Sequence, residues 1–356
     1  MTFADFHHLV LLVSTNPLPN FVVAEFFLQA GIPIHRIWLI HSEDNKLQTG
    51  TSFQTGRLER LLRSRWKDQK PDLQFERISL SDVGDGQMIR RDIRQKMLSE
   101  DAWQHNPKFH LNYTGGTKAM ATHVYLQLQE KQERGERCFS YLDANNFRLL
   151  LDEEGLFPLS GSGDLRQKVH ISFADLIQLH GFKRKNSDKD CSFDPSHDRD
   201  LFNKFCVQAE DRERQNGKFL ERYLFAKIQE KFSDKLREKN EILMNWEIRK
   251  QDWRTYFELD IILMQGYQLT GMSCTINDRK GKVKLKGFEI IHRCRQIGGD
   301  EAKAIIVSGL EGENRKLQQE LEYETGGTRK NILALGLAEL RDEKIYLKKI
   351  EEFIFS

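Results

Sequence analysis

The segment LNYTGGTKAM, residues 111–120, leaves an apolar run, passes two glycines and enters a helical pattern that begins with a lysine. Glycines let the backbone of a strand–loop–helix turn approach a ligand closely, and the first turn of the helix presents unpaired N–H groups to an anion. Thr114 and Thr117 add hydroxyl groups, and Lys118 adds a positive charge. The segment therefore predicts a loop that binds phosphate groups.

The position of this loop separates it from two familiar phosphate-binding motifs. It lacks GxxxxGK[ST], and it follows the fourth predicted strand, so it is neither a Walker A loop nor the dinucleotide fingerprint. The first strand ends in STNPLPN, residues 14–20, which emerges at the same carboxyl edge of a parallel sheet, where open α/β folds bind ligands. In an equally compatible structural interpretation, the glycines only make a turn, and Ser14 and Asn20 only cap a helix.

The first half of the chain alternates short β-rich runs with helical patterns. Strands are predicted at 8–14, 36–42, 74–80, 109–113 and 137–144, and helices at 20–31, 54–67, 87–99 and 117–132. Strands separated by helices indicate βαβ units and a mostly parallel sheet covered on both faces. Residues 1–182 are therefore predicted to form a doubly wound, Rossmann-like domain of the α/β class.

The second half follows a different order. Residues 183–200 are polar and lack apolar periodicity, so they are predicted to be a linker. A helical pattern at 217–240 precedes closely spaced strands, and a second helical pattern and a further strand follow them. Residues 201–356 are therefore predicted to form a second α/β domain, whose strands lie at 246–250, 256–264, 268–276 and 302–308.

The composition indicates a folded chain whose net charge is too small to produce a strong electrostatic field. Its 356 residues favour two domains, and 39% hydrophobic and 30% charged residues supply a core and a polar surface. The charges nearly cancel, with Lys+Arg 55 against Asp+Glu 53, so an anionic partner must meet local clusters. Five scattered cysteines without CxxC spacing predict reduced thiols and no structural zinc. We find no signal-like or membrane-spanning segment and expect a cytoplasmic protein without a membrane partner.

Two motifs carry a resemblance to a known family. VSTNPLPN at 13–20 and NYTGGTKAM at 112–120 resemble the CARF domain of CRISPR-associated effectors in type III systems, in the branch that joins CARF to a PD-(D/E)xK nuclease domain. The resemblance covers both halves of the chain, and TGGTK is its most specific part. It implies a homodimer whose two CARF domains bind a cyclic oligoadenylate across a two-fold axis, usually cyclic tetra-adenylate in this branch. By motif match, the ligand-binding residues are Ser14, Thr15, Asn16, Asn20, Thr114, Gly115, Gly116, Thr117 and Lys118.

A pair of carboxylates in the second half fits the nuclease that this resemblance implies. Glu258 and Asp260 lie two apart in the strand pattern YFELDIIL, so their side chains share a face, which is costly unless they serve a site. A nuclease needs such carboxylates to hold Mg²⁺ or Mn²⁺, which lowers the pKa of a bound water. Glu221 matches the first-helix glutamate of this superfamily, although a solvated helix glutamate is nearly as compatible with the pattern.

The chain departs from the family where the next strand should carry E-x-K. It has Ser273-Cys274-Thr275 there, so the acid and the lysine are both replaced. Either the site is dead, or the functions have migrated, with Glu289 supplying the carboxylate and one of Lys282, Lys284 or Lys286 the charge. Serine on the strand and glutamate on the next helix resemble migrated sites in some restriction enzymes, and we favour migration. The predicted catalytic residues are Asp260, Glu258, Ser273, Glu289, Lys284 and Lys286, and the predicted metal ligands are Asp260, Glu289 and Glu221.

The predicted function follows from both halves together. A basic run at 279–295 beside the carboxylates favours a nucleic-acid substrate, although such runs are often only solvated. We expect a cyclic oligoadenylate-activated, metal-dependent endonuclease of CRISPR antiviral defence that cuts DNA, RNA or both. The alternative is an inactive ligand-sensing scaffold or nucleic-acid-binding regulator. A generic nucleotide-binding α/β enzyme is a third interpretation, which the carboxylate pair makes weaker.

Overall fold

The structure is a computed structural model of the chain, and its described residues form two compact units. Unit 1 contains Met1–Val169 and Gln178–Gly181, and unit 2 contains His170–Ile177 and Phe182–Ser356. The chain therefore changes unit more than once near residues 169–182, where the sequence predicts a single boundary. The described residues are 6–44, 49–104, 107–131, 138–152, 156–158 (backbone alone), 163–185, 194–207, 217–235, 241–250, 256–328 and 330–355.

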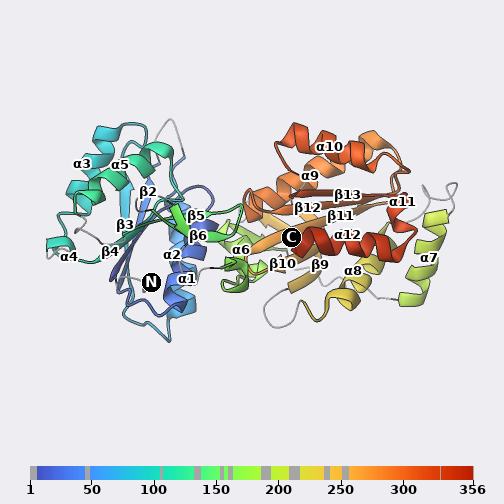
Figure 1. The fold of residues 1–356 in the computed structure, drawn as a ribbon, viewed down its shortest axis with the longest axis horizontal. Coiled ribbons are helices and arrows are strands. Elements are labelled where there is room, and N and C mark those ends of the chain that lie inside the picture. The colour runs from blue at the N-terminus through green and yellow to red at the C-terminus, as the bar shows by residue number, and fades with distance from the viewer. Residues whose placement is uncertain are drawn as a thin grey trace. The chain divides into compact units, whose positions relative to one another are not determined.

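Unit 1 is built on a seven-stranded sheet in the order β3-β2-β1-β4-β5-β6-β7 (Figure 1). Strands β1 to β5 pair in parallel, and β6 and β7 add an antiparallel edge. The strand order reverses between β1 and β4, which is the switch point where such sheets bind ligands. The strands are β1 (His8–Leu12), β2 (Arg36–Ser42), β3 (Gln74–Leu80), β4 (Phe109–Asn112), β5 (Phe139–Asp143), β6 (Arg148–Asp152) and β7 (Leu156–Pro158).

Helices cover both faces of this sheet. In Figure 1, α3 and α5 lie on one face and α1 and α2 on the other. Ile93 of α3 and Val124 of α5 share a core with Val10 and Leu12 of β1, because alternate strand residues point to the same face. The helices are α1 (Leu18–Gln29), α2 (Ser52–Trp66), α3 (Gly86–Lys96), α4 (Asp101–Gln104) and α5 (Lys118–Gln129), with a 3-10 turn at Leu165–Gln167.

Unit 2 is built on a six-stranded sheet in the order β13-β12-β11-β10-β9-β8. Strands β8 to β11 form an antiparallel meander, and β11 to β13 pair in parallel. This sheet differs from that of unit 1, so the predicted α/β class with two topologies is confirmed. The strands are β8 (Phe182–Arg184), β9 (Glu241–Lys250), β10 (Tyr256–Gln265), β11 (Gln268–Thr275), β12 (Lys303–Ser308) and β13 (Ile332–Leu335).

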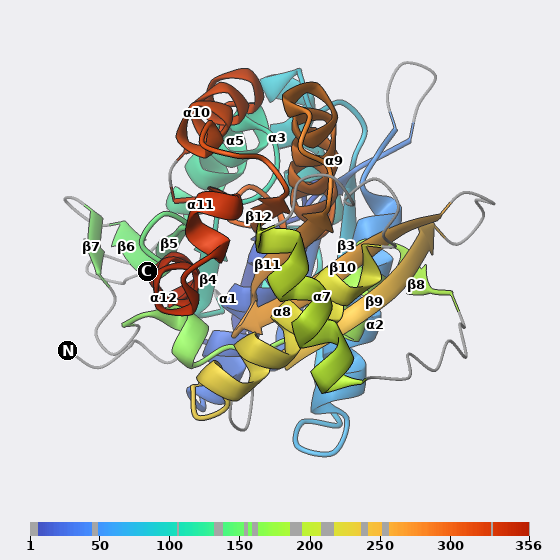
Figure 2. The same cartoon turned by 90° about the vertical axis from the view of Figure 1, so that its right-hand side faces the viewer.

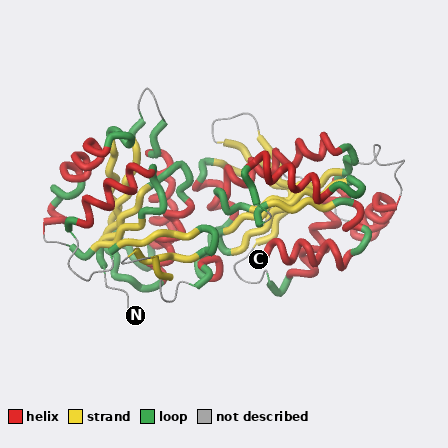
Figure 3. Tube along the Cα trace, turned by 45° about the horizontal axis from the view of Figure 1, so that its top comes forward, coloured by secondary structure: helices red, strands yellow, loops and turns green. Residues whose placement is uncertain are grey.

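The second sheet also lies between two layers of helices, as Figures 2 and 3 show. Helices α9 and α10 lie on one side, and α7, α8 and α12 lie on the other. Leu220 and Leu224 of α8 pack with Ile261 of β10, Met272 of β11 and Tyr346 of α12 in one buried core. The helices are α6 (Phe173–Leu179), α7 (Pro195–Val207), α8 (Lys218–Phe232), α9 (Lys280–Gly298), α10 (Asn314–Thr325), α11 (Leu337–Leu340) and α12 (Glu343–Phe355).

The predicted linker at 183–200 contains regular structure at both of its ends. Arg184 lies opposite Ile248 as β8 joins the edge of the second sheet, and α7 begins at Pro195. The polar composition conceals this strand because it is three residues long and is anchored by Phe182, whose ring lies 5.9 Å from that of Phe257. Residues 186–193 lie outside the described part of the chain. No helix among the described residues combines the length and the apolarity needed to cross a bilayer.

Candidate functional site

Gly115, in the loop between β4 and α5, packs against the end of β1. A methyl group on Gly115 would lie 1.9 Å from the carbonyl oxygen of Leu12, so a larger residue would force the loop and strand β1 apart. The same carbonyl accepts a hydrogen bond from Nδ2 of Asn20 at 2.9 Å. Because β1 and β4 are parallel neighbours, with Leu11 opposite Asn112, the two predicted ligand loops emerge side by side at the switch point.

The predicted residues of the first loop divide into exposed and buried groups. Thr15 is exposed, and Oγ of Ser14 donates to the carbonyl of Asn16 at 3.0 Å. Oδ1 of Asn16 accepts the backbone N–H of Leu18 at 3.1 Å, which orients the first turn of α1. Asn20 is fully buried, so the structure places it to hold Leu12 rather than to contact a ligand directly.

The predicted residues of the second loop show the same division. Oγ1 of Thr114 accepts the backbone N–H of Leu142 at 2.7 Å. Oγ1 of Thr117 accepts the backbone N–H of Met120 at 3.1 Å and caps α5, while Gly116 has the positive φ of 76° that the turn requires. Lys118 is exposed at the first position of α5 and makes no ion pair with the described residues. Lys118 is therefore the loop's available cation for an anion at this edge.

Two positioning residues of unit 1 were missed by the sequence reasoning. Oδ1 of Asn112 accepts the backbone N–H of Thr114 at 3.3 Å, and Nδ2 of Asn112 donates to Oγ of Ser140 at 3.0 Å. Nε2 of His180 lies 3.1 Å from Oδ1 of Asn16, although the two residues are 164 positions apart in the chain. The asparagine before the glycine loop was a readable signal, but no local pattern identifies the histidine.

The second site forms where β10 and β11 lie side by side. Oδ2 of Asp260 accepts the backbone N–H of Cys274 at 2.7 Å and lies 3.3 Å from Oγ of Ser273. Ser273 stands where the family pattern expects the acid, and it contacts the predicted metal-binding carboxylate as a hydrogen-bond donor. Strand β11, which carries Ser273 in place of the expected acid, therefore orients Asp260.

Negative charges converge around this carboxylate. Burial and the nearby Glu258 carboxylate raise the pKa of Asp260 to about 6, although the hydrogen bond from Cys274 opposes the shift. Burial raises the pKa of Glu221 on α8 to about 8, and repulsion from Asp260 and Glu258 adds to it. Burial also raises the pKa of the Cys274 thiol, as do the charges of Asp260 and Glu221. Glu221 therefore lies within electrostatic reach of the β10 carboxylates, which favours a site residue over a solvated glutamate.

Helix α9 separates the predicted lysines. Nζ of Lys286 lies 3.1 Å from Oε2 of Glu289, and the Lys286 charge makes a small contribution that opposes the rise in the pKa of Asp260. Lys284 is instead held by α10, with Nζ 2.6 Å from Oε1 of Glu324 and 3.1 Å from Oε2 of Glu320. Of Lys284 and Lys286, Lys286 is thus the lysine whose charge reaches Asp260. Glu289 pairs with this lysine, and among the described residues no hydrogen bond joins it to Asp260.

A further carboxylate and a further lysine lie on the same sheet face. Glu247 of β9 is buried directly opposite Glu258 of β10, so the two side chains project from one face. Nζ of Lys185, just after β8, lies 2.9 Å from Oε2 of Glu247. The alternation in WEIRK made Glu247 detectable as a strand carboxylate. Lys185 was hidden in the segment predicted to be a linker.

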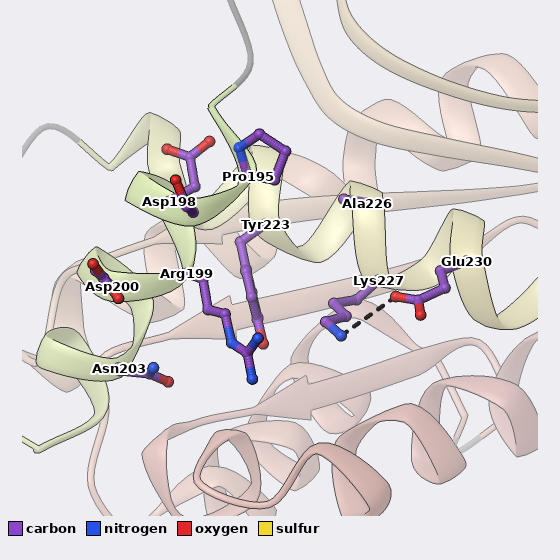
Figure 4. Close-up of a pocket in the computed structure, with 10 residues that line it drawn as sticks. Pro195, Asp198, Arg199, Asp200, Asn203, Tyr223, Ala226, Lys227 and Glu230 are labelled. Atoms are coloured by element: carbon purple, nitrogen blue, oxygen red, sulfur yellow. Dashed lines mark hydrogen bonds and ion pairs between the residues drawn. The ribbon is translucent and has the colours of Figure 1, made fainter.

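A pocket of about 700 Å³ lies apart from these carboxylates, between α7 and α8. Figure 4 shows Arg199, Tyr223 and Lys227 extending from the two helices into the same space. The lining charges are largely balanced within the protein, since Lys227 lies 3.3 Å from Glu230 and Asp198 binds Arg222 at 2.5 Å. None of the predicted site residues lines this pocket.

Comparison with known proteins finds likeness at the level of fold. No protein-family model matches the chain, and no curated protein matches it. The solved structure of protein VC1899 from Vibrio cholerae aligns over 98% of each chain, with a TM-score of 0.67 and 13% identity. Can2 from Sulfobacillus thermosulfidooxidans, in complex with cyclic tetra-adenylate, aligns over 98% of this chain and 99% of its own, with a TM-score of 0.62 and 15% identity. The chain shares the fold of these two structures.

A third structure matches part of a longer protein. It is a type III CRISPR defence DNA nuclease activated by cyclic oligoadenylate, and it aligns over 87% of this chain with a TM-score of 0.54 and 19% identity. The chain spans 47% of the length of that nuclease. The likeness therefore concerns the fold of the shared part.

The side chains around Asp260 are of the chemical type that binds a hard divalent cation, but their arrangement does not form a complete metal site. Carboxylate oxygens are the ligands that Mg²⁺ and Mn²⁺ prefer. The raised pKa values of Glu221 and Asp260 reflect buried negative charge, which a cation would relieve. Among the described residues, however, no three His, Cys, Asp or Glu side chains are grouped closely enough to hold a metal ion.

Proposed function

We propose that this protein is a cyclic oligoadenylate-activated, metal-dependent nuclease of type III CRISPR defence, with a CARF-like unit 1 and a PD-(D/E)xK-like unit 2. The observation that carries the proposal is the carboxylate of Asp260, which the Cys274 backbone N–H holds at 2.7 Å on the sheet of unit 2, in a chain whose unit 1 has a switch-point anion loop. The comparisons support it, because one structure of the same fold was solved with cyclic tetra-adenylate and another is a DNA nuclease activated by cyclic oligoadenylate.

The sensing half of the proposal rests on the two loops at the end of β1 and β4. Lys118 and the N–H groups at the start of α5 supply positive charge for a phosphate, and Gly115 lets this loop pack against the end of β1. Thr15 is exposed in the neighbouring loop. A cyclic oligoadenylate repeats its phosphates symmetrically, so two copies of this edge in a homodimer would bind one ring.

The cutting half of the proposal assigns distinct roles around Asp260. Asp260 and Glu221 would hold Mg²⁺ or Mn²⁺, which when bound lowers the pKa of a water and neutralises charge on the phosphate. Ser273 and the backbone of Cys274 orient Asp260. Lys286 brings a positive charge to the substrate phosphate, and Glu289 holds that lysine in place. Glu289 thus acts through Lys286 in this proposal, while a direct contact with the metal remains the sequence-based hypothesis.

One cleavage assay tests this function. The purified protein is mixed with cyclic tetra-adenylate, Mn²⁺ and labelled single-stranded RNA, single-stranded DNA or plasmid. We expect cleavage of at least one substrate that requires both the activator and the metal. Sedimentation and titration should find a dimer that binds one ring per two chains. A monomer that binds one ring per chain would contradict the shared site.

An inactive ligand-sensing scaffold is the second candidate function. The replacement of E-x-K by Ser273-Cys274-Thr275 favours it, and so does the lack of a three-ligand metal group in the described residues. A scaffold would bind cyclic tetra-adenylate with the same stoichiometry and cut none of the substrates with Mn²⁺ or Mg²⁺. The same assay therefore separates the two functions.

A further inference from the structure

Tyr256 is an exposed aromatic side chain on the sheet face that carries the proposed nuclease carboxylates. It begins β10 and remains 51% exposed. Side chains two apart on a strand share a face, so Tyr256 projects beside Glu258, with Asp260 next along the strand. A large ring left half in solvent beside a row of carboxylates is available for contact with a ligand.

Positive charge surrounds this ring. Nζ of Lys185 lies 3.8 Å from the centre of the Tyr256 ring and is held 2.9 Å from the buried Glu247. Arg249 lies directly opposite Tyr256 in the β9–β10 register and so projects from the same face. Its Nε is buried without a hydrogen-bond partner in the described part of the chain. Lys185 and Arg249 therefore offset the carboxylates where a phosphate chain would approach.

We propose that Tyr256, Lys185 and Arg249, here named the β9–β10 platform, bind an unpaired nucleotide of the nucleic-acid substrate beside Glu258 and Asp260. The inference rests on the proposed function, because it takes the substrate to be nucleic acid. Tyr256 stacks on the base, while Lys185 and Arg249 contact the flanking phosphates.

This chemistry selects the strandedness of the substrate. A base inside a duplex is already stacked on both neighbours, so it reaches a surface tyrosine only after unpairing, which costs a few kcal/mol. A single strand or a frayed end exposes its bases without that cost. The β9–β10 platform therefore favours single-stranded DNA or RNA over an intact duplex of the same sequence.

The basic run on α9 supplies fewer contacts of this kind than its sequence suggests. Lys280 and Lys284 pair with glutamates at and just before α10, with Nζ of Lys280 2.7 Å from Oε1 of Glu320 and 3.3 Å from Oε2 of Glu313. These lysines would have to break ion pairs to meet a phosphate. Lys185 is also paired with a carboxylate, Glu247. This pair lies on the same sheet face as Glu258, so Lys185 is held beside the proposed site.

Binding can be measured separately from cleavage. Fluorescence anisotropy with cyclic tetra-adenylate and Ca²⁺ in place of Mn²⁺ would compare labelled single-stranded DNA, single-stranded RNA and duplex DNA of one sequence. We expect Tyr256→Ala to weaken binding of the single strands about tenfold or more, with little change for the duplex. Tyr256→Trp should retain the single-strand affinity, because it keeps an aromatic face. The matched control is Tyr323→Ala, which removes a tyrosine that is 88% exposed on α10 and should leave binding unchanged.

The contribution of Lys185 to the platform can be measured through the salt dependence of binding. Lys185→Met combined with Glu247→Gln removes the cation without leaving a buried unpaired carboxylate, so the fold is kept. Its log affinity for single strands should depend on log salt with a slope smaller by about 0.7, the value for one lost phosphate contact. Thermal unfolding of each variant checks that the fold is intact.

The outcomes separate the platform from the proposed function. Wild-type affinity for single strands in Tyr256→Ala, or an equal loss in Tyr323→Ala, overturns the platform even if the protein cleaves nucleic acid. A wild type that binds no oligonucleotide overturns both. If the wild type binds single strands through Tyr256 but never cuts them, the platform stands and the nuclease function fails.

Discussion

Oδ2 of Asp260 accepts the backbone N–H of Cys274 at 2.7 Å, so the main chain of β11 holds this carboxylate in place. Asp260→Asn can keep this hydrogen bond through its amide oxygen while it removes the charge. We expect it to lower metal-dependent cleavage by about 100-fold or more, because a carboxylate is lost from the metal site. Cyclic tetra-adenylate binding by calorimetry should be unchanged. Cleavage at the wild-type rate would remove Asp260 from the reaction.

Lys286 and Lys284 provide a matched pair on one helix. Lys286→Met should reduce cleavage strongly, because Lys286 is the α9 lysine whose charge acts on Asp260. Lys284→Met should leave cleavage close to wild type, since Lys284 is paired with Glu320 and Glu324 of α10. Initial cleavage rates at saturating activator measure the difference. Equal effects of the two changes would contradict the role given to Lys286.

Glu289 separates direct metal binding from support of Lys286. If it binds the metal, Glu289→Gln should abolish cleavage and weaken Mn²⁺ binding measured by calorimetry. If it only holds Lys286, at 3.1 Å, the change should lower cleavage and leave Mn²⁺ affinity intact. Glu324→Gln, which faces Lys284, serves as the control. Full activity in Glu289→Gln would exclude both roles.

Lys118 should determine the affinity for the activator. Lys118→Ala deletes a charge-assisted phosphate contact worth about 1.5 to 3 kcal/mol, so calorimetry should show roughly a 10- to 100-fold weaker binding of cyclic tetra-adenylate. Lys131 is exposed just beyond the other end of α5, and Lys131→Ala should not change the affinity. An unaltered affinity in Lys118→Ala would place the ligand elsewhere.

Gly115 should tolerate no side chain. Gly115→Ala would bring a methyl group against the carbonyl oxygen of Leu12, and overpacking of this kind costs about 1 to 3 kcal/mol. We expect a lower free energy of unfolding together with weaker activator binding. Gly281→Ala in α9 meets open space and should stabilise the protein by about 0.5 to 1 kcal/mol. A Gly115→Ala protein as stable as wild type would show that the two loops do not pack as described.

His8 should make unit 1 sensitive to acid. Burial, helped by Arg36, His7 and His35, lowers the pKa of His8 from 6.5 to about 4, and its Nδ1 accepts the Trp38 Nε1–H at 3.2 Å. Between these two pH values the unfolded chain binds the proton more readily than the folded one, so the free energy of unfolding should fall as the pH drops from 6.5 toward 4.

Urea unfolding at several pH values measures this dependence. His8→Gln keeps a hydrogen-bond acceptor without the titration and should flatten the slope. His197→Gln, at an exposed histidine of α7, should leave the slope unchanged. An equal slope in wild type and His8→Gln would assign the acid sensitivity to other groups.

The sequence by itself determined the two α/β units and the glycine loop. The first strands and helices were readable because alternating or helical apolar patterns fix which face is buried, and TGGTK follows such a strand directly. The pair Glu258 and Asp260 was readable for the same reason, since residues two apart on a strand share a face. These signals are local, so they can be recognised in the sequence without knowledge of the fold.

Only the tertiary structure decided which distant residues meet. It brings Leu12 against Gly115 and Lys185 beside Glu247. It also gives Lys284 and Lys286 different glutamate partners, Glu324 and Glu289. Each of these contacts joins residues from different elements, and their geometry depends on strand order and on which side of a helix faces the sheet. No local pattern encodes that geometry, because a lysine on either side of α9 fits the same sequence periodicity. The fold pairs Lys284 with glutamates of α10 and leaves Lys286 to pair with Glu289 of α9.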